Sequence, residues 1–244
     1  MSAAAARPPE RARPLEAVRA LRALVANPDD TAQVFRVVRA LSGRSFEGVL
    51  RRTQADPLGA RILAERRSLH PALADLDRLR ALPEGSLGRE YARFMDAEQI
   101  SANGLVEASR ADAPEDEHRL GPEGAVLGER LRDMHDLWHV VTGYGRDLIG
   151  EAALLSFTYA QTRNRGIGAI VAVALYKLWR AGATDAVALI RGAWRRGRAA
   201  AFLPAADWEA LLELPLDEVR RRLHVGPLPR YEQIRSAGAP PAAA

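Results

Sequence analysis

Cysteine is missing from this 244-residue chain, and lysine occurs once, at Lys177. Without cysteine there are no disulfides, no thiolate metal ligands and no cysteine nucleophile, so any metal must be held by nitrogen and oxygen atoms. Aromatic residues make up only 6% of the chain, and no basic block alternates with them. Binding of single strands by stacking needs that alternation. The sequence therefore predicts no nucleic-acid partner, although the net charge is +4.

Long apolar runs are also missing. The most apolar stretch, residues 166–176, is followed by Lys177 and Arg180, and it is shorter than the roughly 20 residues that span a bilayer. It predicts a core helix, and a lipid-lined cavity or a membrane-facing surface is the alternative. The N-terminal segment lacks the apolar core of a signal peptide and contains Glu10 and Glu16. It therefore predicts a bacterial protein of the cytoplasm or the cytoplasmic face of the inner membrane.

What the chain does contain is helical periodicity over almost its whole length, with no convincing strand. We expect an all-α fold, a single-domain multi-helix bundle of residues 14–235 between disordered Ala/Pro-rich ends at 1–13 and 236–244. The polar segment 101–117 is predicted to be a loop. The predicted helices cover residues 15–25, 31–41, 46–53, 57–65, 86–95, 122–141, 147 onward, 166–176, 185–197, 206–212 and 215–224.

One motif concentrates potential metal ligands. Its pattern is His-Asp-x-x-His-(x)11-Glu, formed by His135, Asp136, His139 and Glu151. Two imidazoles and two carboxylates within seventeen residues are a ligand set for a divalent cation. The motif therefore predicts a metal site.

Helix geometry supports this prediction. Residues four apart share a helix face, so His135 and His139 point the same way. Asp136 lies at the edge of that face and either joins the coordination or orients a ligand. The glycines in 143–145 end the helix, and the next helix starts near residue 147 and returns Glu151 to the first. The sequence thus predicts a metal site on a helical hairpin.

Three other interpretations use the same residues. A metalloprotease would need glutamate directly after the first histidine, and the shorter Asp136 argues against that class. A metal-dependent phosphohydrolase would add an upstream histidine and a downstream aspartate, for which the candidates are His70 or His118 and Asp147 or Asp185. A structural metal in a non-enzymatic, lipid-binding scaffold would have closed coordination by protein ligands.

The motifs resemble those of the coenzyme Q (ubiquinone) biosynthesis protein 4 family. The histidine motif matches that family's signature at all four positions. The sequence LPEGSLGREYARF at 82–94 is similar to its second signature, and residues 164–197 with Trp208 and Glu209 follow in the same order. The resemblance covers roughly residues 30–225.

The resemblance implies that His135, Asp136, His139 and Glu151 are metal ligands and carry the catalysis. The metal would be divalent, zinc or alternatively iron or cobalt. The implied substrate is a polyprenylated 4-hydroxybenzoate, which would lose its carboxylate at ring carbon 1, alone or coupled to hydroxylation there. The implied partners are other ubiquinone biosynthesis proteins, whose complex such a protein helps to organise. A peripheral membrane contact is implied as well, on the matrix side of the mitochondrial inner membrane if the source is eukaryotic, and a homodimer is left open.

Two arginines are candidates for binding the substrate. Arg132 lies one turn before His135 on the predicted ligand face. Arg89 follows the turn at 82–85, in which Gly85 is expected to adopt a backbone conformation that glycine tolerates at low cost. Both side chains could pair with an anionic group.

Overall fold

The computed structural model describes residues 14–26, 33, 36–37, 40–41, 44–99, 120–227 and 229–233. Within these ranges the all-α class is confirmed, because the only β-type pairing is an isolated bridge between Ser86 and Pro215. The predicted ends at 1–13 and 236–244, the loop at 101–117 and most of the helix at 31–41 lie outside the described residues.

Most described helices agree with the predicted ones within a few residues, but two short helices within 70–80 and a 3-10 turn at 203–205 were not predicted. In chain order they are α1 (Pro14–Ala26), α3 (Ser45–Ala55), α4 (Pro57–Ala64), α5 (His70–Ala74), α6 (Leu76–Arg80), α7 (Leu87–Ala97), α10 (Gly121–Thr142), α11 (Leu148–Thr162), α12 (Arg165–Arg180), α13 (Thr184–Ala199), the 3-10 turn η1 (Leu203–Ala205), α14 (Trp208–Leu211) and α15 (Leu216–Arg222).

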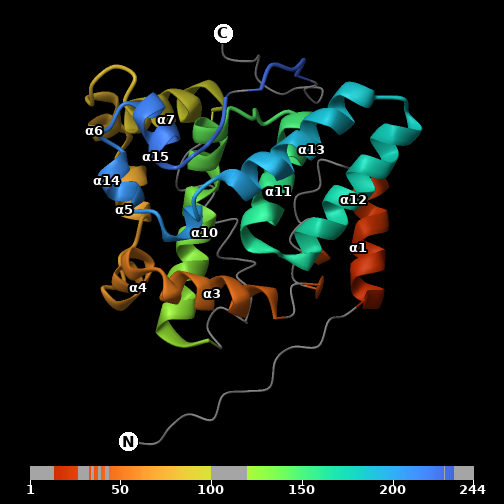
Figure 1. Ribbon diagram of the computed structural model, residues 1–244, viewed down its shortest axis with the longest axis horizontal. Coiled ribbons are helices and arrows are strands. Elements are labelled where there is room, and N and C mark those ends of the chain that lie inside the picture. Colours follow the sequence, from red (N-terminus) through yellow and green to blue (C-terminus); the bar gives the residue numbers. More distant parts are fainter. Residues whose placement is uncertain are drawn as a thin grey trace, which may run out of the picture.

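The centre of the fold is formed by α10, α11 and α13, which lie between α7 and α15 on one side and α12 on the other (Figure 1). Helix α11 packs along α13 at close range. The two helices are so close that a Cβ atom added at Gly197 would lie 2.7 Å from the carbonyl oxygen of Phe157. Two buried polar groups tie the helices together. Ser156 donates to the carbonyl of Ile190, and the Gln161 amide donates to the carbonyl of Gly197. The contact holds α11, which carries Glu151, in a fixed position.

Helix α7 is set against α10 by the turn before it. Gly85 has φ +74, as expected for a position that favours glycine. Ser86 then accepts a hydrogen bond from the backbone of Arg89 and caps the helix. The buried side chains of α7 join those of α10 in the main core, with Leu87 and Met95 on one helix and Met134 on the other.

Helix α12 corrects one prediction. Residues 166–176 do form a helix, but only Gly166, Ile170 and Val171 of α12 are buried. Tyr176 is 59% exposed and Trp179 is 68% exposed. The helix covers the bundle instead of filling its core, because α11 and α13 already occupy the interior. In the described part of the chain no helix is both long and apolar enough to cross a membrane.

Candidate metal centre

The ligand face predicted for α10 is present. His135, Asp136 and His139 each offer a ligand atom, and these atoms lie within 4.8 Å of one another. Asp136 and His139 are buried, whereas the side chain of His135 is 38% exposed. The face is therefore closed toward the core and open toward solvent on the side of His135.

Glu151 reaches this group from the first turn of α11. Its Oε1 lies 3.5 Å from Nε2 of His139, and its Oε2 lies 4.0 Å from Nε2 of His135. The hairpin geometry explains the approach. Gly143 ends α10 with φ +74, and Asp147 starts α11 by accepting hydrogen bonds from the backbone of Ile149 and Gly150. The structure thus brings all four predicted residues together.

His139 is oriented as a metal ligand would be. Its Nδ1 lies 2.8 Å from the carbonyl oxygen of Tyr144. A carbonyl can only accept, so Nδ1 carries the proton and Nε2 presents a lone pair. Nε2 is buried and has no hydrogen-bond partner among the described residues. A buried acceptor without a donor, beside two carboxylates and a second imidazole, fits a divalent cation.

The charges of the group are strongly coupled. Burial would raise the pKa of Glu151, but His139, His135 and Arg146 lower it to about 2. Burial and the charge of His139 lower the pKa of His135. Burial would also lower the pKa of His139, but the Glu151 carboxylate outweighs this effect and the pKa is raised. Glu151 is therefore anionic at neutral pH, as a ligand for a cation must be.

The second sequence motif meets the first one in space. Phe94, its last residue, stacks on the ring of His139 with the ring centroids 5.6 Å apart. Tyr91 of the same helix is buried, and the pKa of its hydroxyl is raised by burial and by the charges of Asp136 and Asp133. The end of the segment 82–94, with Tyr91 and Phe94, therefore lies against the candidate metal centre.

Arginines hold the end of α10 in place. The last carbonyls of a helix have no partner within it. Here Arg220 donates to the carbonyls of Val140 and Val141, and Arg196 donates to that of Thr142. The turn that carries Tyr144 is thereby fixed relative to α13 and α15.

The loop between the ligand helices is also held by Tyr231. Its hydroxyl donates to Oδ2 of Asp147 at 2.7 Å and accepts from the backbone N–H of Gly145 at 2.8 Å. A side chain at Gly150 would lie 2.4 Å from this hydroxyl, so glycine makes room for it. Tyr231 thus fixes the start of α11, one turn before the side chain of Glu151.

Removing this hydroxyl should loosen the centre. In Tyr231→Phe, the Gly145 N–H and Asp147 each lose the hydrogen bond to this hydroxyl, and we expect the free energy of unfolding to fall by about 1–2 kcal/mol. Metal affinity should fall by about tenfold, the lower end of effects seen for residues that orient metal ligands. Thermal unfolding and zinc titration measure the two effects. Tyr176→Phe removes an exposed hydroxyl and serves as the control. Equal zinc affinity in both variants would contradict the assigned role.

Three arginines differ in their relation to the centre. Arg146, which no sequence motif indicated, has its Nε 3.8 Å from Oε1 of Glu151. Arg89 donates to the carbonyl of Leu82 and lies near Glu84, within the turn before α7. Arg132 lies one turn before His135, beside Asp133, whose pKa is raised to about 6 by burial and by the charge of Glu129, an effect that the charge of Arg132 only partly offsets. The substrate-binding roles of Arg89 and Arg132 stay predictions.

The additional residues of a phosphohydrolase do not join the group. Among the described residues only His135, Asp136 and His139 form a candidate metal cluster of three or more. Asp147 is used as a helix cap, and the charge of His70 acts on Asp133. His118 lies outside the described residues. This arrangement does not favour the phosphohydrolase interpretation.

An all-helical protein with a candidate metal centre on a helical hairpin is the class that the fold and the site define. The profile of one family, the coenzyme Q (ubiquinone) biosynthesis protein Coq4, matches residues 10–229. The chain belongs to this Coq4 family, as the resemblance of its motifs predicted.

Similar proteins come from distant organisms. The chain is 34% identical over 182 residues to the mitochondrial ubiquinone biosynthesis protein COQ4 homolog of Rattus norvegicus, covering 73% of this chain and 64% of the relative. It is 34% identical to the mitochondrial ubiquinone biosynthesis protein coq4 of Aspergillus clavatus, covering 74% and 61%. The chain thus spans less than two thirds of the length of these relatives.

A solved structure has a similar fold. A crystal structure of a protein from Nostoc punctiforme, described as a ubiquinone biosynthesis protein, matches with a TM-score of 0.66 and 25% identity. The match covers 89% of this chain and all of that one. The fold is therefore similar over most of both chains.

Proposed function

We propose that this chain acts in ubiquinone biosynthesis and removes the carboxylate at ring carbon 1 of a polyprenylated 4-hydroxybenzoate, in a metal-dependent reaction that is either simple or coupled to hydroxylation. Membership of the Coq4 family supports the pathway. The donor set on the hairpin supports the dependence on a metal.

One observation favours an enzyme over a scaffold with a structural metal. His139 is fully buried, but the side chains of His135 and Glu151 are 38% and 34% exposed. Structural metal sites are closed by protein ligands, whereas catalytic sites keep a position open. The exposed side of the ligand group is where a substrate would enter.

The residues have distinct roles in this proposal. His135, His139, Glu151 and Asp136 would hold the cation, and His139 is kept in the required tautomer by its hydrogen bond to Tyr144. A divalent cation there would act as a Lewis acid on an anionic oxygen of the substrate. Zinc would suffice for that role, but hydroxylation by oxygen would need a redox-capable ion such as iron or cobalt.

Arg146 is the chain's own candidate for binding the substrate carboxylate. Its side chain is 34% exposed, and its Nε lies 3.8 Å from Oε1 of Glu151, whose side chain is also 34% exposed. A guanidinium can hold a carboxylate through two parallel hydrogen bonds and thereby orient the ring. In decarboxylation without hydroxylation, carbon dioxide leaves and ring carbon 1 takes up a proton. Arg146 then loses its partner, which favours release of the product.

The intermediates of the pathway test this function. In a ubiquinone-producing strain that lacks its own Coq4, the chain should restore ubiquinone, and Glu151→Gln should not. The variant strain should accumulate polyprenyl hydroxybenzoate that still carries its carboxylate, as detected by mass spectrometry of lipid extracts. Accumulation of an intermediate without that carboxylate would exclude decarboxylation as the step, and normal ubiquinone levels with Glu151→Gln would favour a scaffold.

A membrane contact is the second part of the proposal, since a polyprenyl substrate is insoluble in water. The exposed aromatic side chains of α12, Tyr176 and Trp179, lie 6.4 Å apart between ring centroids. Lys177 of the same helix donates to the carbonyl of Val25 at the end of α1, whose Leu15 and Val18 are also exposed. Aromatic and basic side chains on one amphipathic surface suit a bilayer interface. We propose that the protein is located at the membrane surface that faces the cytoplasm or the mitochondrial matrix.

Charging this surface should weaken membrane binding. Tyr176→Glu/Trp179→Glu replaces two apolar anchors with carboxylates, and we expect the fraction bound to phosphatidylcholine vesicles to fall about tenfold. Co-sedimentation measures the bound fraction. Leu58→Glu changes an exposed apolar residue on α4 and should bind as the unchanged chain does. Equal loss in both variants would refute the assignment to α12.

A further inference from the structure

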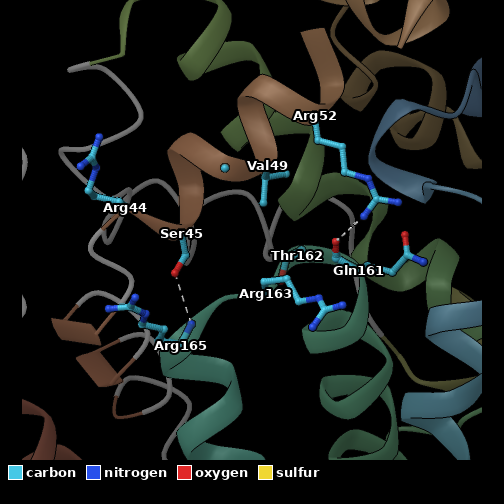
Figure 2. Close-up of a pocket in the computed structure, with 9 residues that line it drawn as sticks. Arg44, Ser45, Val49, Arg52, Gln161, Thr162, Arg163 and Arg165 are labelled. Carbon is cyan, nitrogen blue, oxygen red and sulfur yellow. Dashed lines mark hydrogen bonds between the residues drawn. The ribbon is translucent and has the colours of Figure 1, made fainter. Parts of the chain in front are cut away.

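A cavity separate from the metal centre lies between the start of α3 and the junction of α11 with α12. Its volume is about 370 Å³, within the range of small-molecule sites. Gln161 on its wall follows Glu151 by ten residues of α11, which corresponds to about 15 Å along the helix axis. Figure 2 shows its lining residues, which are Arg44, Ser45, Gly48, Val49, Arg52, Gln161, Thr162, Arg163 and Arg165.

The lining is strongly basic. Of the nine described residues that line it, four are arginines and none is acidic. Within the described part of the chain only Arg44 of these four has a carboxylate partner, Glu47 at 3.2 Å. Partial burial lowers the pKa of Arg52, and the charge of Arg163 lowers it further. The guanidinium groups of Arg52 and Arg163 therefore repel each other, and an anion between them would relieve that repulsion.

Arg52 is held by neighbouring groups, and Arg163 lies at the end of a helix. Arg52 donates to the carbonyl of Gln161 at 3.4 Å and lies over the ring of Phe202, 3.8 Å from its centroid. Arg163 ends α11 with φ +56, a conformation that is uncommon outside glycine. Gln161 in turn is anchored by hydrogen bonds to Gly197 and Leu203. This end of the cavity is thus attached to the core of the fold.

The other end of the cavity contains two helix starts. Helices α3 and α12 begin there, and the backbone N–H of Arg165 donates to Oγ of Ser45 at 3.4 Å (Figure 2). Asn164 caps α12, whereas no side-chain cap is recorded for α3 among the described residues. The first backbone N–H groups of α3 add a partial positive charge to that of the arginines.

We propose that this cavity binds the phosphate group of an anionic ligand. Forked guanidinium groups and helix N-termini match phosphate oxygens in geometry and charge. A carboxylate has one charge and two oxygens, so it would satisfy fewer of the three arginines that have no carboxylate partner among the described residues. The ligand is either the headgroup of a phospholipid or a soluble phosphate compound. This proposal does not depend on the function proposed for the metal centre.

Binding of defined probes to the full chain tests the proposal. The probes are inorganic phosphate and diphosphate in titration calorimetry, and phosphatidylcholine vesicles with and without phosphatidylglycerol in co-sedimentation. Arg52→Gln/Arg163→Gln should lose at least tenfold in affinity. The control, Arg191→Gln/Arg195→Gln, removes the same charge from exposed positions of α13. Circular dichroism and thermal unfolding verify that both variants fold.

The outcomes separate the two sources of phosphate. Saturable binding of phosphate or diphosphate that only the Arg52/Arg163 variant loses would support a soluble ligand. A loss confined to binding that depends on phosphatidylglycerol would support a lipid headgroup. Equal affinities in variant and control, or no saturable binding of any probe, would overturn the proposal.

Discussion

His139→Ala should lower the affinity of the purified chain for a divalent metal by at least about 100-fold, more than the 10–100-fold typical of residues that only orient a ligand. The reason is the burial of His139, whose Nε2 lies 3.5 Å from Glu151 and has no hydrogen-bond partner in the described part of the chain. Water cannot easily replace a donor atom in that position. Glu151→Ala should have a similar effect, because it removes the only predicted ligand from α11. Elemental analysis and titration with zinc or cobalt measure the loss.

His70→Ala provides the control for this result. His70 is the described upstream histidine that a phosphohydrolase site would use, but it lies near Asp133 and outside the ligand group. We expect its replacement to leave metal content unchanged, close to one ion per chain. Full metal content in His139→Ala would disprove the assigned centre, and loss of metal in His70→Ala would revive the phosphohydrolase interpretation.

The ligand group could be predicted from sequence because its geometry is local. Two histidines four residues apart on one helix share a face whatever surrounds them. The glycines after α10 and the cap at Asp147 also act within a few residues, so the hairpin that returns Glu151 was predictable. The order and spacing of the four ligand residues in the sequence therefore determine how their side chains come together.

The remainder of the centre could not be predicted because it comes from distant parts of the chain. Phe94 stacks on His139 from α7, and Tyr231 holds the loop from the C-terminal segment. Nothing in the spacing of these residues shows that they meet. Arg146 had a detectable signal, since it lies within the loop that joins the two ligand helices. Among so many arginines, that signal was not distinctive.

The same distinction applies to the fold. Helical periodicity predicted the all-α class and most helix positions, because that pattern depends on local spacing. It did not predict the exposure of α12, since an Ala/Gly-rich apolar run fits both a core helix and a covering helix. Which one forms depends on the neighbours, and here α13 packs on α11 through Gly197.

Glu209 also shows what a sequence pattern leaves open. It belongs to a C-terminal part of the resemblance, and the structure gives it a clear structural role. Arg130 is only 1% exposed and donates to both carboxylate oxygens of Glu209, at 2.7 and 2.9 Å. Arg130 also donates to the carbonyl of Arg67, whose own side chain pairs with Asp207. These contacts join α10 to the segments before α5 and around α14.

Glu209→Ala should therefore be strongly destabilising. It leaves the Arg130 guanidinium buried without its bidentate partner, and breaking a buried pair in this way costs about 3–5 kcal/mol. Glu209 is partly exposed and Asp207 remains near Arg130, so we expect the lower end, about 3 kcal/mol. For a chain of this size that corresponds to a decrease in Tm of roughly 6–12 °C. Thermal and urea unfolding measure it.

Two further variants separate the buried pair from carboxylate loss in general. Glu213→Ala removes a carboxylate that pairs with Arg78 at 3.3 Å on the surface, where both side chains are about half exposed or more. Exposed pairs contribute about 0–1 kcal/mol, so its Tm should change little. Glu209→Gln keeps an acceptor for Arg130 but not the charge, and its stability should fall between those of the two alanine variants. If Glu209→Ala and Glu213→Ala unfold at the same temperature, the ion pair between Arg130 and Glu209 does not stabilise the junction of α10 with α14. The presence of Glu209 in the part of the chain that resembles the family would then require a functional explanation.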